Sequence, residues 1–389
     1  SEYESLDNEG KPSWQNDFEA RYPEDNTDYT NLKRLTDWIV STEGNIDKFK
    51  NEFNQYFNLH YTTVYFILTE LFAMVDSRAK NMFLATWDKN IWYPVFYDMD
   101  TCFGLNNEGV LAFNYNVEST DTLGTQNVYN GKDSLLWNNF REAFANEIKD
   151  LYNELRDKDI ITYEKVLDIL EREQIARLCE AQYNEDARYK YLDPLLNENI
   201  STYLYIAQGN RINHLKYWLF NRFNYMDSKH MASDYKNNYA TMRLYTPSEW
   251  VGVEPNASFE ITPFANQYAT VKFGSYVVSD RAKANESISI VPPDIQFNDT
   301  ETIIYGADRI ASLGDLSNKY AGTVDMSKAT QLTELIIGSG VEGYKNENLH
   351  NVSVGNNKLL RKIDVRNCPN LTQPLDLSNC DNVEEVYAS

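Results

Sequence analysis

The sequence predicts an α+β protein whose 389 residues divide into three regions. Residues 1–235 combine helical patterns with one β-hairpin, residues 236–300 alternate strand-like runs with turn residues, and residues 301–389 carry a short repeat. Apolar spacing of three and four is typical of a helix with one buried face, and alternation is typical of a half-buried strand. A chain of this length exceeds one ordinary core, which favours several domains.

The charge of the chain limits its partners. The formal net charge is −22 and the isoelectric point is about 4.6. Such a surface repels phosphate backbones and anionic lipid, so neither nucleic acid nor a membrane is expected as a main partner. The longest apolar run, residues 62–75, falls short of the roughly 20 residues that a bilayer requires. It predicts a buried helix instead.

The first region is predicted to be rich in helices. Asp159 or Thr162 is expected to cap the fourth of them, and Trp218, Phe220 and Phe223 are expected to anchor the fifth in a core. The predicted helices are residues 32–41, 62–75, 136–155, 163–178 and 211–226.

Three cations also lie along the fifth predicted helix. Arg211, Lys216 and Arg222 are more typical of a solvated face than of an anion site. The sequence therefore assigns them no chemistry.

The second region is predicted to be a small all-β, sandwich-like module. Its strand-like runs end at the break Pro292-Pro293-Asp294. The runs are residues 241–246, 257–264, 268–274 and 286–291.

The third region contains short segments that each carry the apolar pair of a strand. Val352 and Leu375 are 23 positions apart, and so are Ile363 and Val386. The segments are residues 332–338, 349–355, 359–365, 374–378 and 383–389. This pattern resembles the leucine-rich-repeat family, which implies a short solenoid whose stacked units share one core. Cys368 and Cys380 are then expected to face inward rather than to form a disulfide or a metal site.

A hairpin in the first region brings polar groups together. Residues 82–87 and 91–97 flank the turn Asp88-Lys89-Asn90. A two-residue loop would place Asn81 opposite Asp98, and a three-residue loop would shift the pairing by one. Strand alternation would put Asp98 and Asp100 on one face.

Asp76 precedes the first strand and is expected to reach the same end of the hairpin. Converging carboxylates repel one another unless a cation neutralises them, and oxygen ligands of this kind suit Mg²⁺. Asp76 and Asn81 also have the D-x-x-x-x-N separation of the base and metal-binding Asn of protein kinases, and D-x-D-x-x-F-G follows one hairpin later.

Together with FEARYPED at residues 18–25, these motifs resemble the CotH family of spore-coat-protein-H-like atypical kinases over roughly residues 14–230. The resemblance implies a kinase-like fold, ATP with Mg²⁺, and phosphoryl transfer to Ser or Thr of a protein. It implies that Asp76 is the general base, that Asn81 and Asp98 are metal ligands, and that Asp100 is a second ligand or orients the first. Phe103 and Gly104 would pack and turn the next loop.

In this family the lysine that contacts the phosphates and the N-terminal lobe that holds adenine precede the region where this chain begins. No Gly-rich loop substitutes for them in the sequence. The polypeptide alone is therefore expected to bind ATP poorly, and its nucleotide site is expected to be incomplete.

Two functional hypotheses remain. The first is a CotH-like kinase whose β and repeat modules contact a protein partner. The second is a structural or adhesion protein, for example a bacteriophage virion component that uses the kinase-like domain as a scaffold. The segment from residue 304 onward loosely resembles tail-associated proteins of gut bacteriophages. The module combination favours an extracytoplasmic or virion-associated protein that belongs to a larger assembly.

Overall fold

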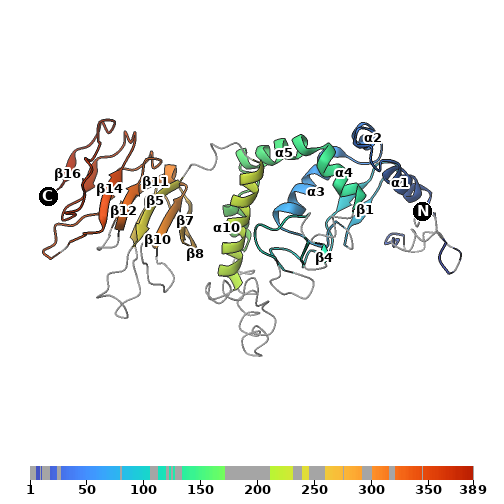
Figure 1. Ribbon diagram of the computed structural model, residues 1–389, viewed down its shortest axis with the longest axis horizontal. Coiled ribbons are helices and arrows are strands. Elements are labelled where there is room, and N and C mark those ends of the chain that lie inside the picture. Colours follow the sequence, from blue (N-terminus) through green and yellow to red (C-terminus); the bar gives the residue numbers. More distant parts are fainter. Residues whose placement is uncertain are drawn as a thin grey trace, which may run out of the picture.

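The computed structural model describes most of the chain in separate stretches. These are residues 6–8, 10, 18–23, 28–78, 81–105, 113–119, 122–123, 126–127, 134–170, 211–230, 239–244, 259–274, 276–290, 300–314, 320–343 and 345–388. We call residues 18–230 the helical region and residues 239–388 the two-sheet region. Helix α10 stands between the other helices and the sheets, and the two chain ends lie at opposite ends of the molecule (Figure 1).

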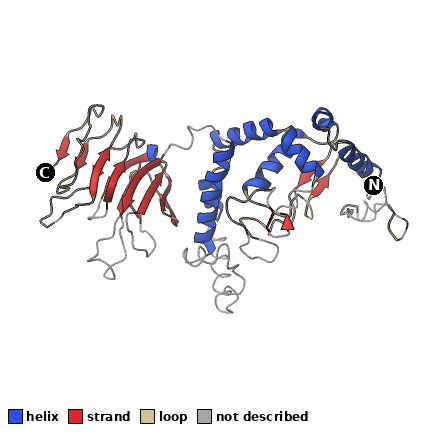
Figure 2. Cartoon of the chain, viewed as in Figure 1, coloured by secondary structure: helices blue, strands red, loops and turns tan. Residues whose placement is uncertain are grey.

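The helical region contains most of the predicted helices (Figure 2). Its elements are α1 (Thr30–Ser41), α2 (Ile46–Glu52), η3 (Phe53–Gln55), α3 (Leu59–Leu71), α4 (Leu135–Ala143), α5 (Ala145–Asp157), α6 (Tyr163–Leu170) and α10 (Arg211–His230), with short strands β3 (Thr122–Leu123) and β4 (Gln126–Asn127). Residues 171–178 of the fourth predicted helix lie outside the described residues.

The prediction of one helix over residues 136–155 was wrong, because α4 and α5 are separate. The chain breaks at Phe144, whose backbone has φ −118° and ψ 28°. This residue is 2% exposed, and its ring packs 4.9 Å from that of Phe53 and 5.2 Å from that of Phe140. Burial of the ring therefore outweighs the continuous apolar pattern.

Polar side chains cap several of these helices. Asn45, Asn58 and Ser134 each accept a hydrogen bond from the backbone N–H three residues later. Of the two candidates for α6, Thr162 is the cap, since its hydroxyl accepts from the N–H of Lys165 at 3.1 Å. These bonds satisfy donors that the first helical turn leaves unpaired.

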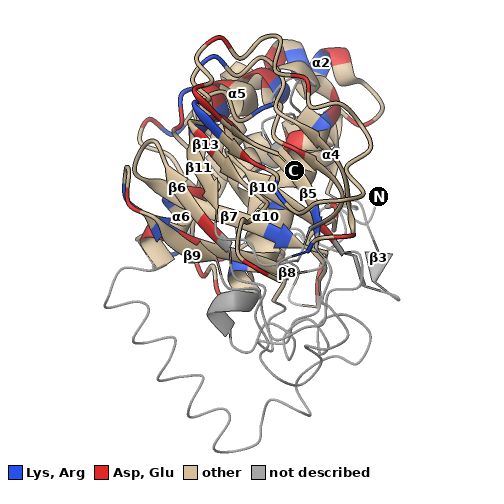
Figure 3. Cartoon of the chain, turned by 90° about the vertical axis from the view of Figure 1, so that its left-hand side faces the viewer, with Lys and Arg blue, Asp and Glu red and all other residues tan. Residues whose placement is uncertain are grey.

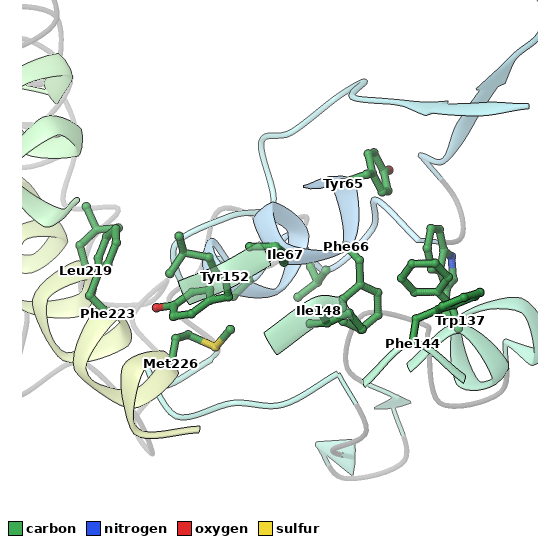
Figure 4. Close-up of a cluster of buried hydrophobic side chains, with 14 of the residues drawn as sticks. Tyr65, Phe66, Ile67, Trp137, Phe144, Ile148, Tyr152, Leu219, Phe223 and Met226 are labelled. Atoms are coloured by element: carbon green, nitrogen blue, oxygen red, sulfur yellow. The ribbon is translucent and has the colours of Figure 1, made fainter. Parts of the chain in front are cut away.

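Aromatic rings dominate the core of the helical region (Figure 4). Trp137 and Tyr65 are almost fully buried, and their rings stack at 5.9 Å. The expected anchors Trp218, Phe220 and Phe223 are 2%, 5% and 2% exposed. The prediction of a buried face on α10 is confirmed.

The hairpin forms with a different register from the two-residue-loop prediction. Strands β1 (Phe83–Ala85) and β2 (Tyr93–Val95) pair Phe83 with Val95 and Ala85 with Tyr93, which is the pairing shifted by one. Lys89 has a φ of 61°, and the Asp88 carboxylate accepts from the N–H groups of Asn90 and Ile91 at 2.8 Å. This turn occupies more residues than a two-residue loop allows.

Two six-stranded sheets make up the two-sheet region. Their orders are β14-β12-β5-β10-β7-β8 and β16-β15-β13-β11-β6-β9. The bounds are β5 (Tyr239–Leu244), β6 (Phe259–Pro263), β7 (Gln267–Phe273), β8 (Tyr276–Ala282), β9 (Ile288–Ile290), β10 (Thr300–Tyr305), β11 (Ile310–Gly314), β12 (Tyr320–Asp325), β13 (Glu334–Ile336), β14 (Leu349–Ser353), β15 (Lys362–Asp364) and β16 (Glu385–Tyr387), with η7 (Ala307–Arg309). Strands from both sides of residue 300 share both sheets and one hydrophobic cluster, so the expected module boundary falls within them.

The repeat segments form parallel strands that alternate between the two sheets. Strands β13, β15 and β16 pair in parallel in one sheet, and β14 pairs with β12 in the other. Ile363 lies opposite Val386, as their spacing of 23 predicts. Residues 374–378, however, form no strand. Cys368 and Cys380 are free, and each is 5% exposed, so the prediction that they face inward is confirmed.

Asparagine side chains join consecutive repeats of this part of the chain. Asn357 donates to the carbonyl of Ala329 at 2.7 Å, and Asn382 donates to that of Lys358 at 2.6 Å. The positions of acidic and of basic residues are interspersed along these strands and along the helices (Figure 3).

Candidate functional site

The candidate site begins where α3 ends. The N–H of Val75 donates to the carbonyl of Thr101 at 3.1 Å, and the N–H of Phe103 donates to that of Phe72 at 2.8 Å. Residues 72–75 therefore run beside residues 101–103, although the hairpin separates them in sequence. This pairing brings the two predicted motifs together.

Asn81 and Asp98 meet at the open end of the hairpin. The Asn81 amide donates to the Oδ2 of Asp98 and to its backbone carbonyl, both at 3.3 Å. The N–H of Asn81 also donates to the carbonyl of Asp76 at 3.0 Å, which closes the loop that carries Asp76. The predicted neighbourhood of Asn81 and Asp98 therefore survives the shift of register.

The prediction that Asp98 and Asp100 share one face of a strand was wrong, because neither residue belongs to the strand. Strand β2 ends at Val95, and Asp98 has a φ of 48°, which interrupts the alternation. Both carboxylates are exposed, whereas Asp76 is half-buried. In the part of the chain that the structure describes, no three His, Cys, Asp or Glu side chains gather closely enough to hold a metal ion.

The donor set fits Mg²⁺ in part. One carboxylate and one amide meet, and Mg²⁺ is usually held by one or two carboxylates together with substrate phosphates. The hydroxyls of Ser77 and Thr101, next to Asp76 and Asp100, are buried and have no hydrogen-bond partner among the described residues. Such groups call for a water or another polar ligand nearby.

Cys102 adds no nucleophile to this site. Burial, and secondarily the charge of Asp100, raises the pKa of its thiol to about 12. A nucleophilic cysteine requires the thiolate form, so this residue is inert at neutral pH.

The expected packing of Phe103 and Gly104 is present. The ring of Phe103 lies edge-on to Phe72 at 5.6 Å and near Trp218 at 6.3 Å. Gly104 has a φ of 91°, and a Cβ there would lie 2.5 Å from the carbonyl oxygen of Phe113. Only glycine fits at this turn.

The sequence reasoning missed a buried ionic network beneath the loop. Glu70 accepts from Arg78 at 2.6 Å, and Arg222 lies 3.8 Å from its second oxygen. Both arginine side chains are 0% exposed, so the prediction of a solvated face was wrong for Arg222. Lys216 is half-buried, and the side chain of Arg211 lies outside those described.

The network keeps Glu70 ionised. Burial alone would raise the pKa of this carboxyl, but Arg78, Arg222 and the hydrogen bond from Ser119 lower it to about 2. The sequence did contain one signal for this network. Glu70 is the only charged residue in the apolar run of residues 62–75, and a buried carboxylate requires a charged partner.

Two surface cavities lie in other parts of the described chain. One, of about 1360 Å³, lies between α6, α10 and strands β7 and β8. The other, of about 680 Å³, lies along β14. Neither is lined by Asp76, Asn81, Asp98 or Asp100.

Comparison with known families agrees with this geometry. The family described as CotH kinase protein matches residues 2–226, which is more than half of the chain. The chain belongs to the CotH kinase family. No curated protein and no solved structure is found to match it.

The matched residues cover most of the helical region and end within α10. The loop with Asp76 and Asn81 and the segment from Asp98 to Gly104 both lie inside the match. The two-sheet region lies beyond it, so the family gives no information about these strands.

Proposed function

We propose that this CotH-like protein takes part in Mg²⁺- and ATP-dependent phosphoryl transfer to Ser or Thr of a protein. The observation that carries the proposal is the contact between Asn81 and Asp98 beside the loop of Asp76. The family match supports a nucleotide-using ancestry for the same residues.

Each residue has a distinct role in this proposal. Asp76 accepts the proton of the substrate hydroxyl. Its side chain is half-buried, so part of it remains accessible to a substrate. Asn81 and Asp98 hold the metal ion, with Asp100 as a further ligand or an orienting group. The metal ion, when bound, offsets charge on the phosphates. Asp98 and Asp100 are exposed, which leaves room for the nucleotide to supply the remaining ligands of the metal ion.

The two-sheet region is proposed to bind a protein partner as part of a larger assembly, since repeat regions commonly offer extended contact surfaces. An extracytoplasmic or virion-associated setting is proposed with it. No helix among the described residues is long and apolar enough to cross a membrane.

A scaffold role is the second candidate. The observation that favours it is the separation of the carboxylates, which form no three-membered metal cluster in the described part of the chain. In that case the kinase-like domain is a building block, for example of a bacteriophage tail, and ATP is not used.

Two measurements distinguish these functions. The full-length protein is incubated with γ-labelled ATP and MgCl₂, and its melting temperature is recorded with and without Mg²⁺ and nucleotide. Ligand at 100 times its dissociation constant would stabilise the fold by about 2.7 kcal/mol. We expect Asp98→Ala to lose most of this stabilisation and Asp76→Ala to lose transfer while it keeps binding.

Asp150→Ala is the matched control, because it removes one exposed carboxylate from α5, far from the motif in sequence. It should behave as the wild type. Absence of both transfer and ligand-dependent stabilisation in the wild type would leave the scaffold role.

A further inference from the structure

The guanidinium of Arg222 joins three segments that are distant in sequence. Its Nε donates to the carbonyl of Leu71 at 3.3 Å, and one terminal nitrogen donates to that of Glu70, so it caps the end of α3. The other terminal nitrogen donates to Tyr115 at 2.8 Å and to Val117 at 2.5 Å. A planar group with five donors can serve all these carbonyls at once, and a lysine ammonium cannot.

The end of α3 leads directly into the loop of Asp76. The side chain of Arg78, within this loop, ties the loop back to α3. Arg78 donates to Glu70 at 2.6 Å and to the carbonyl of Phe66 at 2.8 Å. Its own carbonyl accepts from the indole of Trp137 at 3.0 Å. The loop is therefore attached to α3 and α4 through side chains that are buried.

The segment that Arg222 binds on its other side continues from the Phe103-Gly104 turn. The N–H of Phe113 donates to the carbonyl of Gly104 at 2.9 Å. The indole of Trp218 donates to the carbonyl of Phe113 at 3.2 Å. Trp218 and Arg222 are four residues apart on α10 and thus share one face of this helix.

We propose that Arg222 is a positioning residue that fixes the loop of Asp76 and Asn81 relative to the segment of Asp98 and Asp100. Helix α10, at the far end of the family match, thereby becomes part of the candidate site. The positioning itself does not depend on catalysis. Its consequence for metal binding rests on the proposed function.

Local hydrogen exchange tests the positioning in the full-length chain. Arg222→Lys keeps the charge beside Glu70 but loses the fork of donors. We expect amide exchange in peptides that cover residues 72–78, 98–105 and 113–119 to rise about tenfold, while α1, α2 and β7 change less than about twofold. Lys216→Gln is the control on the same helix, since the ammonium of Lys216 donates to the carbonyl of Ser279 in the two-sheet region at 3.2 Å.

The outcome is decisive in either direction. Equal acceleration across the whole helical region, or none in the three peptides, would overturn the proposal. Should Arg222→Lys fail to fold, Trp218→Phe removes the indole donor to Phe113 and keeps an aromatic ring on the side of Phe103, and it should accelerate exchange most strongly in residues 113–119. Its failure to do so would also overturn the proposal.

Mg²⁺ titration of the same variants separates this inference from the proposed function. If the wild type binds Mg²⁺, Arg222→Lys should weaken the affinity about tenfold, and Lys216→Gln should leave it unchanged. An unchanged affinity in Arg222→Lys would contradict the positioning role. If the wild type does not bind Mg²⁺, the proposed function fails, and the exchange data alone decide whether Arg222 positions the loop.

Discussion

The helical region and the two-sheet region hold themselves together in different ways. The helical core consists largely of aromatic rings and encloses paired ions, among them Arg78, Arg222 and the bidentate pair of Arg156 with Asp227. The core between the two sheets consists largely of Ile, Val, Leu and Ala, and its turns repeat similar contacts. The helical region therefore relies on a few polar contacts that occur once, whereas the two-sheet region is stabilised by many similar contacts.

This difference also locates the candidate site. The loop of Asp76 has few backbone partners of its own, so buried side chains must hold it in place. A network of this kind is sensitive to the loss of one member, because the remaining charges stay buried without compensation. A stacked coil loses only the contacts of the substituted side chain with its neighbours.

The largest effect is expected for Glu70→Ala, which leaves Arg78 and Arg222 without their carboxylate. Removal of one partner from a buried ionic group typically costs about 3–5 kcal/mol of unfolding free energy. Six of the seven tryptophans lie within residues 1–226, so urea unfolding followed by tryptophan fluorescence reports on this region. The exposed Glu142→Ala on α4 should change the unfolding free energy by less than about 0.5 kcal/mol. Similar values for both variants would contradict the importance of the network.

A large apolar deletion in the two-sheet region should cost slightly less and act more locally. Ile363 is fully buried on β15 between β13 and β16, and Ile363→Ala should cost about 3.5 kcal/mol. Hydrogen exchange should accelerate in β13, β15 and β16 and stay unchanged in α3 and α4. The exposed Val386→Ala on β16 is the control, with a cost below about 1 kcal/mol. Acceleration within α3 would show that the regions unfold together.

Acid should weaken the helical region through Glu70. Arg78 and Arg222 hold its pKa at about 2 in the folded chain against the effect of burial, and its ordinary value is 4.5. Since the folded pKa is the lower one, the charged carboxylate stabilises the fold above about pH 4.5, and this contribution disappears as the pH falls towards 2. The difference corresponds to on the order of 3 kcal/mol.

Urea midpoints measured from pH 7 to pH 2 for the wild type and Glu70→Gln give this contribution by difference. The variant should show the shallower dependence on pH below pH 4.5. Parallel curves for the two proteins would contradict a low pKa for Glu70.

The sequence predicted what depends on local pattern. Helix α1 follows from apolar spacing of three and four, and the parallel pairing of Ile363 with Val386 follows from the repeat spacing. Helix α3 follows from the continuous apolar run over residues 62–75, although it ends at Leu71 and not at the end of that run. Strand β8 was not among the expected strands. It carries Asp280 and Arg281, which weaken its apolar pattern, yet it pairs with β7 along its whole length. Tertiary pairing thus decides where the local pattern is weak.

The candidate site was predictable in its members but not in its geometry. The contact of Asn81 with Asp98 follows from their places at one end of the hairpin, whatever its register. The left-handed backbone of Asp98 could not be read from residue types, and neither could the partners of Arg222, because these carbonyls lie more than 100 residues away. Side chains that serve distant backbone atoms leave no periodic signal in a sequence.

The smallest effect tests whether repeated contacts in the two-sheet region are equivalent. Asn357 is 1% exposed and donates to the carbonyl of the buried Ala329, and Asn382 makes the same kind of bond at an exposed position. Asn357→Ala should cost about 1–2 kcal/mol, because the freed carbonyl stays away from water. Asn382→Ala should cost less than about 0.5 kcal/mol, since water replaces the lost donor. The hydrogen-exchange rates of the amides in β13 and β15 measure the destabilisation that each variant causes. Equal costs would mean that the asparagine contacts stabilise each turn regardless of burial, so that even this region depends on specific polar contacts as the helical region does.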